Sequence, residues 1–285
     1  MYVIWNDSIS IGDVLCTFPG TLELAKLCKV RYGGCSIVWQ NNAVGDLFPH
    51  AKYGIGRLYD TSRASERISI HDMVHKGIAH PTKHGHPTAQ FMAHVGFEEL
   101  STHALRPEIV YDQYPQSQTY DIIISPYILA EIVRFWPLDR WQKVLNYLHD
   151  NGYTVGCLGA TALPPADDLK KISPHNQLHF EAYKAMMKKS MEYCDYVFDR
   201  PLGEVAYLMS KARAVITVDS GPARLMHAVG GNHLLLCNSS VAKEWGTYPE
   251  ATTVFEPLQS LEAARVIPLV ATMLEASEVK HRLAQ

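Results

Sequence analysis

Short apolar runs alternate with longer amphipathic stretches along most of the chain, a pattern typical of a parallel sheet covered by helices. The apolar runs predict strands at residues 2–5, 35–40, 120–125, 153–159, 195–199, 214–218 and 233–237. The amphipathic stretches predict helices at residues 17–29, 88–97, 137–152, 180–193, 202–212, 222–229 and 260–283. The alternation therefore predicts an α/β fold.

The alternation of strand and helix starts a second time after residue 118. The stretch DQYPQSQ, residues 112–118, is polar and rich in turn-forming residues, as expected of a linker. The 285 residues are enough for two domains of ordinary size. We therefore predict two α/β domains, one at residues 1–118 and the other at residues 119–285.

Composition excludes several classes of protein. An apolar fraction of 47% and a charged fraction of 19% indicate a folded globular protein, and a net charge of −3 gives no general attraction to nucleic acid. No run approaches the roughly 20 apolar residues of a membrane span, and the N-terminus lacks the basic region of a signal peptide. The six cysteines never form Cys-x-x-Cys, which argues against a zinc site or a disulfide framework. We expect a cytoplasmic protein with reduced thiols and no transmembrane segment.

The first candidate loop for chemistry lies between the first expected strand and its helix. Parallel α/β sheets bind ligands where strands end and loops lead into helices. Residues 6–20 contain Gly12, which suits a turn with an unusual backbone angle, followed by Asp13. Asp13 would serve either as the N-cap of the helix or as a general base facing a cleft.

A second loop, residues 125–141, carries Arg134 shortly before Pro137, which opens a helix. A guanidinium at the mouth of a helix can bind phosphate oxygens through two hydrogen bonds, because it is always charged and planar. The alternative is a surface arginine paired with Glu131 or Asp139. The chain contains neither the GxGxxG of a dinucleotide site nor a P-loop.

A third loop, Asp219-Ser220-Gly221, joins a buried strand to a helix. Ser220 and Gly221 can offer a hydroxyl and backbone N–H groups to a phosphate at the helix N-terminus. Asp219 can accept hydrogen bonds from the hydroxyls of a sugar. The alternative is simple N-capping, for which Asp and Ser are both well suited.

These loops carry a family resemblance. Three segments resemble the motifs of the ADP-heptose:lipopolysaccharide heptosyltransferase family of glycosyltransferases, and they follow one another along the chain in the family's order. They are DSISIGDVLCTFPG (7–20), RFWPLDRWQKVLNYLHDNGYTVGCLGA (134–160) and VDSGPARLMHAVG (218–230). PLGEVAYLMSKARAVITVDSG (201–221) resembles the helix and strand before the third motif. The resemblance spans nearly the whole chain.

The resemblance implies the GT-B architecture, in which two Rossmann-like domains face each other over a cleft. The N-terminal domain would take the acceptor and the C-terminal domain the nucleotide sugar. The family transfers a sugar from a nucleoside-diphosphate sugar to an acceptor hydroxyl with inversion, using no metal and no cofactor other than the donor.

Matched to the family motifs, Asp13 is the expected general base. The residues expected at the phosphates and the sugar of the donor are Ser125, Arg134, Asp219, Ser220, Gly221 and Arg224. Arg224 stands where the family motif has histidine, and Met226-His227 stand where it has small residues. An arginine there would add a second phosphate contact or line a different donor pocket.

The acceptor side is expected to include Gly12 and the histidine-rich segment at residues 50–94. This segment holds six Lys/Arg, three Asp/Glu and seven His, so it could meet a polyanion such as a phosphorylated lipid core or a nucleic-acid backbone. Zinc binding is an alternative, although neither a carboxylate nor a cysteine completes an ordinary ligand set. A solvated acceptor loop is the simplest interpretation. Its histidines assigned to the acceptor side are His71, His75, His84 and His86.

Three other functions fit the same architecture. The acceptor could be a hydroxymethylated base in DNA, as for phage DNA glycosyltransferases, instead of a phosphorylated glycolipid or saccharide. A sugar-nucleotide 2-epimerase would turn over the donor without any acceptor. A sugar-nucleotide-binding protein that has lost catalysis would need no base such as Asp13.

Overall fold

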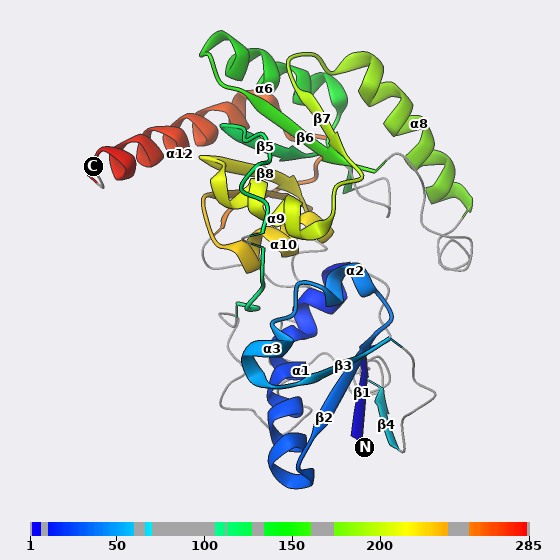
Figure 1. Cartoon of the computed structure of the whole chain (residues 1–285). Helices are drawn as coiled ribbons and strands as arrows, with labels where there is room; N and C mark the ends of the chain where they lie inside the picture. The colour runs from blue at the N-terminus through cyan, green and yellow to red at the C-terminus, as the bar shows by residue number, and fades with distance from the viewer. Residues whose placement is uncertain are drawn as a thin grey trace. The chain divides into compact units, whose positions relative to one another are not determined.

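The fold is described from a computed structural model that defines residues 2–6, 11–59, 66–69, 106–111, 113–126, 134–160, 174–238 and 251–283. The chain forms two compact units that divide between Asp112 and Gln113, at the start of the stretch expected to be a linker. Figure 1 shows each unit as a parallel sheet with helices against it. Assignment of residues 1–118 to an acceptor and 119–285 to a nucleotide sugar remains a prediction.

The first unit is built on a four-stranded parallel sheet in the order β3-β2-β1-β4. Its strands are β1 (Tyr2–Asn6), β2 (Cys35–Trp39), β3 (Gly56–Leu58) and β4 (Glu66–Ser69). Its helices are α1 (Ile11–Tyr32), α2 (Asn42–Gly45) and α3 (His50–Tyr53). Every residue of β2 is buried, including the polar Ser36, as expected of a strand covered on both faces.

The second unit has a six-stranded parallel sheet in the order β10-β9-β8-β5-β6-β7. Its strands are β5 (Ile122–Ser125), β6 (Val155–Gly159), β7 (Asp195–Phe198), β8 (Ala214–Val218), β9 (His233–Cys237) and β10 (Thr252–Phe255). The chain proceeds from β5 through β6 to β7, then returns to the other side of β5. The order of strands thus reverses between β5 and β8, where doubly wound sheets bind ligands at the carboxyl ends of the strands.

Helices cover both faces of this second sheet (Figure 1). They are α6 (Leu138–Asp150), α8 (Pro174–Ser190), α9 (Leu202–Lys211), α10 (Gly221–Val229) and α12 (Ala263–Leu283). Helix α6 contacts α8 and α12, whereas α9 contacts α10. Apolar residues recur every three or four positions along α6 and form one buried side of the helix. They are Leu138, Trp141, Val144, Leu145 and Leu148.

The sequence-based elements agree with the structure best in the second unit. Strands β8 and β9 have the expected bounds, and Gly152 follows α6 with a φ of 75°, as expected of a glycine that ends a helix. The short elements α2, α3, β3, β4 and β10 were not predicted. Helix α1 begins at Ile11, not at residue 17, and α8 begins at Pro174, not at residue 180. The helix expected at residues 88–97 lies outside the described residues.

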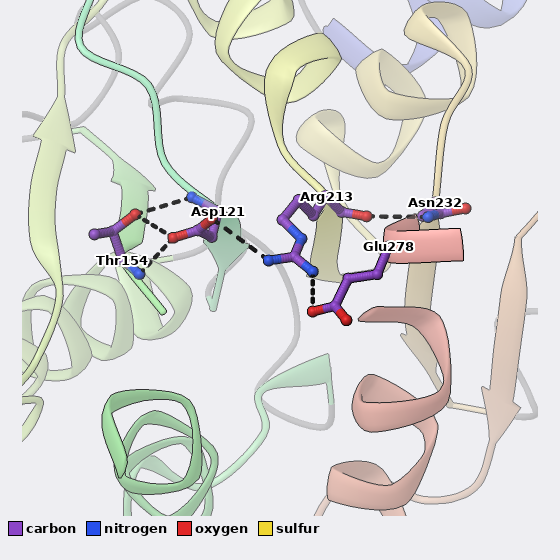
Figure 2. Close-up of polar contacts among 5 residues, drawn as sticks. All are labelled: Asp121, Thr154, Arg213, Asn232 and Glu278. Carbon is purple, nitrogen blue, oxygen red and sulfur yellow. Dashed lines mark hydrogen bonds and ion pairs between the residues drawn. The ribbon is translucent and has the colours of Figure 1, made fainter. Parts of the chain in front are cut away.

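A polar network holds the amino ends of the second sheet together, as Figure 2 shows. Asp121, just before β5, accepts hydrogen bonds from the backbone N–H and the hydroxyl of Thr154, at 2.9 and 2.8 Å. Arg213, just before β8, pairs with Glu278 of α12 at 2.6 Å and with Asp121 at 3.9 Å. Asn232 donates its side-chain N–H to the carbonyl of Arg213 at 3.0 Å. The network therefore links the starts of four strands to α12.

Replacing Arg213 with alanine should lower the free energy of unfolding by about 1 kcal/mol, because this side chain is partly exposed and solvent screens its ion pairs. Thermal or urea unfolding would measure the loss. The matched control is Lys143→Ala, which removes a more exposed ion pair of 3.9 Å with Asp139 on α6. Equal stabilities of the two variants would contradict a bracing role for Arg213.

Candidate functional site

The candidate site lies at the carboxyl edge of the second sheet, where β5 and β8 are neighbours. Ser125 ends β5 and pairs in register with Thr217 of β8. Asp219 and Ser220 follow β8 directly, and α10 begins at Gly221. The residues predicted from two distant loops are thus supported by adjacent strands, because the doubly wound topology places the two strands side by side.

Three of the predicted residues form a charged cluster. Arg224 donates a hydrogen bond from Nη2 to Oδ1 of Asp219 at 3.0 Å, and Arg134 Nη1 lies 4.0 Å from Oδ2 of the same carboxylate. Asp219 and Arg224 are each 6% exposed. The two guanidinium groups and the one carboxylate carry a formal charge of +1 between them, which favours an anionic ligand.

Arg134 has unused hydrogen-bonding capacity in this cluster. Its Nε is buried and has no hydrogen-bond partner within the described structure. Among the described residues, Arg134 pairs with Asp219 and not with the alternative Asp139, which pairs with Lys143; Glu131 lies outside the described residues. A buried donor without a partner is costly, so a ligand that accepts from it would be stabilised.

Ser220 occupies the N-cap position of α10 without capping it through its side chain. Its hydroxyl instead donates to the carbonyl of Val218 at 3.1 Å. The N-capping alternative is therefore wrong for the hydroxyl of Ser220. The N-terminus of α10 carries a partial positive charge, which adds to the electrostatic attraction for an anion next to Arg134 and Arg224.

Sequence reasoning missed a set of buried polar residues beside this cluster. His227 lies one turn after Arg224 on α10 and is also buried, and His233 of β9 forms a hydrogen bond of 2.8 Å with the hydroxyl of Thr217. Burial, with the nearby charges of His227 and Arg224, lowers the pKa of His233 to about 3. The spacing of Arg224 and His227, three residues apart in an otherwise apolar helix, was the available signal for a shared face.

Cys237 at the end of β9 is not suited to nucleophilic chemistry. Burial and the nearby Asp219 carboxylate raise the pKa of its thiol to about 12, against the opposing effect of Arg224 and Arg134. The thiol therefore stays protonated at neutral pH.

Hydrogen bonds fix the chain on both sides of the loop between β5 and α6. The hydroxyl of Tyr183, on α8, contacts the carbonyls of Pro126 at 3.1 Å and Trp136 at 2.9 Å. The indole of Trp136 donates to the carbonyl of Leu261 at 2.8 Å. Since Pro126 and Trp136 lie on either side of Arg134 in the chain, these bonds hold the backbone that carries the guanidinium.

Tyr183→Phe should weaken anion binding at the cluster as well as lower the free energy of unfolding by about 1 kcal/mol. Tyr196→Phe is a closely matched control, because the hydroxyl of Tyr196 likewise contacts two carbonyls, those of Met187 and Met191, at 3.0 Å each. Calorimetric titration with inorganic pyrophosphate measures binding, and thermal unfolding measures stability. If both variants bind pyrophosphate as the parent does, Tyr183 has no positioning role.

The acceptor-side residues predicted from sequence are only partly described. Gly12 and Asp13 lie in the first turn of α1, so Gly12 is helical instead of forming a turn and Asp13 is not the N-cap. Nearby, Asn6 at the end of β1 donates from its side-chain N–H to the hydroxyl of Thr17 at 3.0 Å. The histidines assigned to this side, His71, His75, His84 and His86, lie outside the described residues.

His50, also in the histidine-rich segment, has a structural role. The indole N–H of Trp39 donates to its Nε2 at 2.9 Å. Burial and the charge of Arg57 lower the pKa of His50 to about 4, so the imidazole is neutral at pH 7. Over the described ranges, no group of three or more His, Cys, Asp or Glu is placed to hold a metal ion.

Within the described part of the chain, no helix has both the length and the apolar character needed to cross a membrane.

Solved glycosyltransferases are similar to this chain over nearly its whole length. A glycosyl transferase family 9 structure from Veillonella parvula DSM 2008 is 14% identical, with a TM-score of 0.66, covering 96% of this chain and 97% of the other. The E. coli heptosyltransferase WaaC with ADP is 14% identical, with a TM-score of 0.63, covering 96% and 100%. The dodecameric iron-containing heptosyltransferase TibC, in complex with ADP-D-beta-D-heptose, is 13% identical, with a TM-score of 0.65, covering 97% and 77%. No curated protein matches the sequence.

These similarities confirm the predicted α/β fold of GT-B type. The family model of glycosyltransferase family 9 (heptosyltransferase) matches residues 116–265, which is more than half of the chain. The matched range includes Arg134, Asp219 and Arg224, the three residues of the charged cluster. The chain belongs to glycosyltransferase family 9, the heptosyltransferase family, and is a heptosyltransferase-like glycosyltransferase.

Proposed function

We propose that this glycosyltransferase moves a sugar from a nucleoside-diphosphate sugar to an acceptor hydroxyl, with inversion and without a metal or further cofactor. The observation that carries the proposal is the cluster of Arg134, Asp219 and Arg224 at the N-terminus of α10. It combines a net positive charge, a buried guanidinium N–H without a partner, and a helix dipole at the point where the strand order reverses.

The diphosphate of the donor would bind to the guanidinium groups and to the first turn of α10. Charge-assisted hydrogen bonds from arginine to phosphate are short and about twice as strong as neutral ones. Gly221 contributes a backbone N–H at the same position, and the Ser220 hydroxyl would contribute its O–H by turning from the carbonyl of Val218 to the phosphate. Ser125 stands at the end of the neighbouring strand. Asp219 orients Arg224 and can accept hydrogen bonds from the sugar.

The chemical step is a single displacement at the anomeric carbon. Asp13, assigned as general base by the family resemblance, takes the proton of the acceptor hydroxyl as its oxygen forms the new bond. The bond between the anomeric carbon and the phosphate oxygen breaks, and the nucleoside diphosphate leaves with the bonding electrons. Arg134, Arg224 and α10 stabilise the developing charge, so no metal is needed for that purpose.

The donor and acceptor classes are proposed from the relatives and from charge. WaaC and TibC are described with ADP or ADP-heptose, so an adenosine-diphosphate sugar is the first donor to test. Arg224, in place of the family histidine, would give the diphosphate a second guanidinium. The proposed acceptor is a phosphorylated glycolipid or saccharide, which the cationic segment at residues 50–94 would meet.

A thermal-shift screen with ADP, UDP, GDP, CDP and TDP tests the donor site. A nucleotide at 100 times its dissociation constant should stabilise the protein by about 2.7 kcal/mol, a shift of several degrees. The shift should disappear in Arg224→Ala and persist in Asp13→Asn, because Asp13 is assigned to the acceptor. Absence of a shift with every nucleotide would contradict the proposal.

The finer claims need the donor that the screen selects. NMR of the product would show inversion by the configuration of the anomeric carbon. Activity that survives EDTA treatment would support metal independence, a point of interest because the relative TibC contains iron. Binding of duplex DNA that falls steeply with salt would favour a DNA base as the acceptor, against the proposed glycolipid or saccharide. Donor turnover without an acceptor would favour the epimerase.

A further inference from the structure

Two histidines on α8, neither of them part of the cluster of Arg134, Asp219 and Arg224, are placed together at the surface. His175 and His179 lie in the first two turns of the helix, four residues apart, so that both imidazoles share one face. Their Nε2 atoms are 3.1 Å apart, and their rings are nearly perpendicular, with centroids separated by 4.3 Å. His175 is exposed and His179 is partly exposed.

The separation of the two nitrogens fits two adjacent ligands of one metal ion. Zinc binds imidazole nitrogen at about 2.0–2.1 Å, so nitrogens separated by 3.1 Å would subtend an angle of roughly 100° at the ion. That angle lies between the values for octahedral and tetrahedral coordination. One Nε2 would lose its proton, and both imidazoles would turn their lone pairs toward the ion, while the two nitrogens keep about this separation.

We propose that His175 and His179 form a binding site for a divalent transition-metal ion of the class of Ni²⁺, Cu²⁺ and Zn²⁺. Neutral imidazole is a borderline-soft ligand that these ions prefer, whereas Mg²⁺ and Ca²⁺ prefer oxygen. The two histidines supply two ligands, and water completes the coordination. The competing explanation of the geometry is a hydrogen bond between the two rings, with no affinity for metal.

The expected affinity is moderate, for two reasons. Two protein ligands make fewer bonds than the four of a structural zinc site. The positive end of the α8 dipole also opposes a cation in the first turns. Binding would link two successive turns and thereby stabilise the start of α8.

The test uses the full chain, stripped with EDTA and dialysed, in calorimetric titrations with Ni²⁺, Cu²⁺ or Zn²⁺ alone, and with Mg²⁺ for comparison. His175→Ala and His179→Ala should each remove one equivalent of bound ion, or weaken its binding about tenfold or more. Loss of a residue that only positions a metal ligand already weakens metal binding about 10- to 100-fold, so loss of a ligand itself should weaken it at least as much. His149→Ala is the control, because His149 is an exposed single histidine on α6.

Unchanged binding in both α8 variants would overturn the proposal, as would affinity for Mg²⁺ equal to that for Ni²⁺. Other histidines of the chain could also bind ions, so the number of ions bound and their affinity in each variant are compared with those of the parent protein. Both variants should keep the thermal shift given by a nucleotide, because neither residue belongs to the charged cluster. Failure of the metal site would thus be distinguished from failure of the donor site.

Discussion

Arg134→Ala is expected to lower the rate of nucleoside-diphosphate release from the donor by about two to three orders of magnitude, equivalent to about 2.7–4 kcal/mol. Arg134 lies 4.0 Å from Asp219 and has a buried Nε without a partner in the described structure. A phosphate would gain both a charge and a hydrogen bond from it, and these contacts strengthen as the diphosphate leaves. The rate is measured with the donor that the nucleotide screen selects.

Two controls make this result specific to the guanidinium. Arg265→Ala removes another arginine of the same unit, one that pairs with Glu256 and is largely exposed, and should leave the rate unchanged. Arg134→Lys should recover only part of the rate, because lysine keeps the charge but loses the planar pair of donors. Normal turnover in Arg134→Ala would remove this residue from the proposed mechanism.

Acid is expected to destabilise the second unit through His233. Its pKa is lowered from its ordinary value of 6.5 to about 3, so the folded protein holds this imidazole neutral. Between these two pH values the unfolded chain binds the proton and the folded chain does not. The contribution of His233 to the free energy of unfolding is therefore fully present above pH 6.5 and is lost as the pH drops toward 3. The full difference for this residue is up to about 5 kcal/mol, for a pKa lowered from 6.5 to about 3.

Urea unfolding at several pH values between 7 and 4 measures this dependence. His233→Gln should be less stable than the parent at pH 7, because it disturbs the contact with Thr217, but its stability should change less with pH. His149→Gln, at an exposed position, should keep the full dependence of the parent. The same slope in His233→Gln and the parent would assign the acid sensitivity to other groups.

Parts of the fold and of the site were predictable because each depends on local sequence. Strands buried on both faces have continuous apolar runs, so β8 and β9 were placed with their observed bounds. The strand-to-helix joins that carry Arg134 and Asp219 were found because parallel sheets bind ligands there. The short elements β3, β4 and β10 escaped prediction because their pairing with neighbouring strands, not their own pattern, defines them.

The sequence by itself determined the α/β class, the motifs of the family and the positions of the candidate donor residues. Only the tertiary structure decided what those residues contact. Asp219 faces two arginines, because the strand order places β5 beside β8 and the first turn of α10 above them. The fold buries His233 as a neutral imidazole and brings His175 and His179 within 3.1 Å of each other as the proposed ligand pair. Charge pairing and burial depend on distances across the fold, which one-dimensional patterns do not contain.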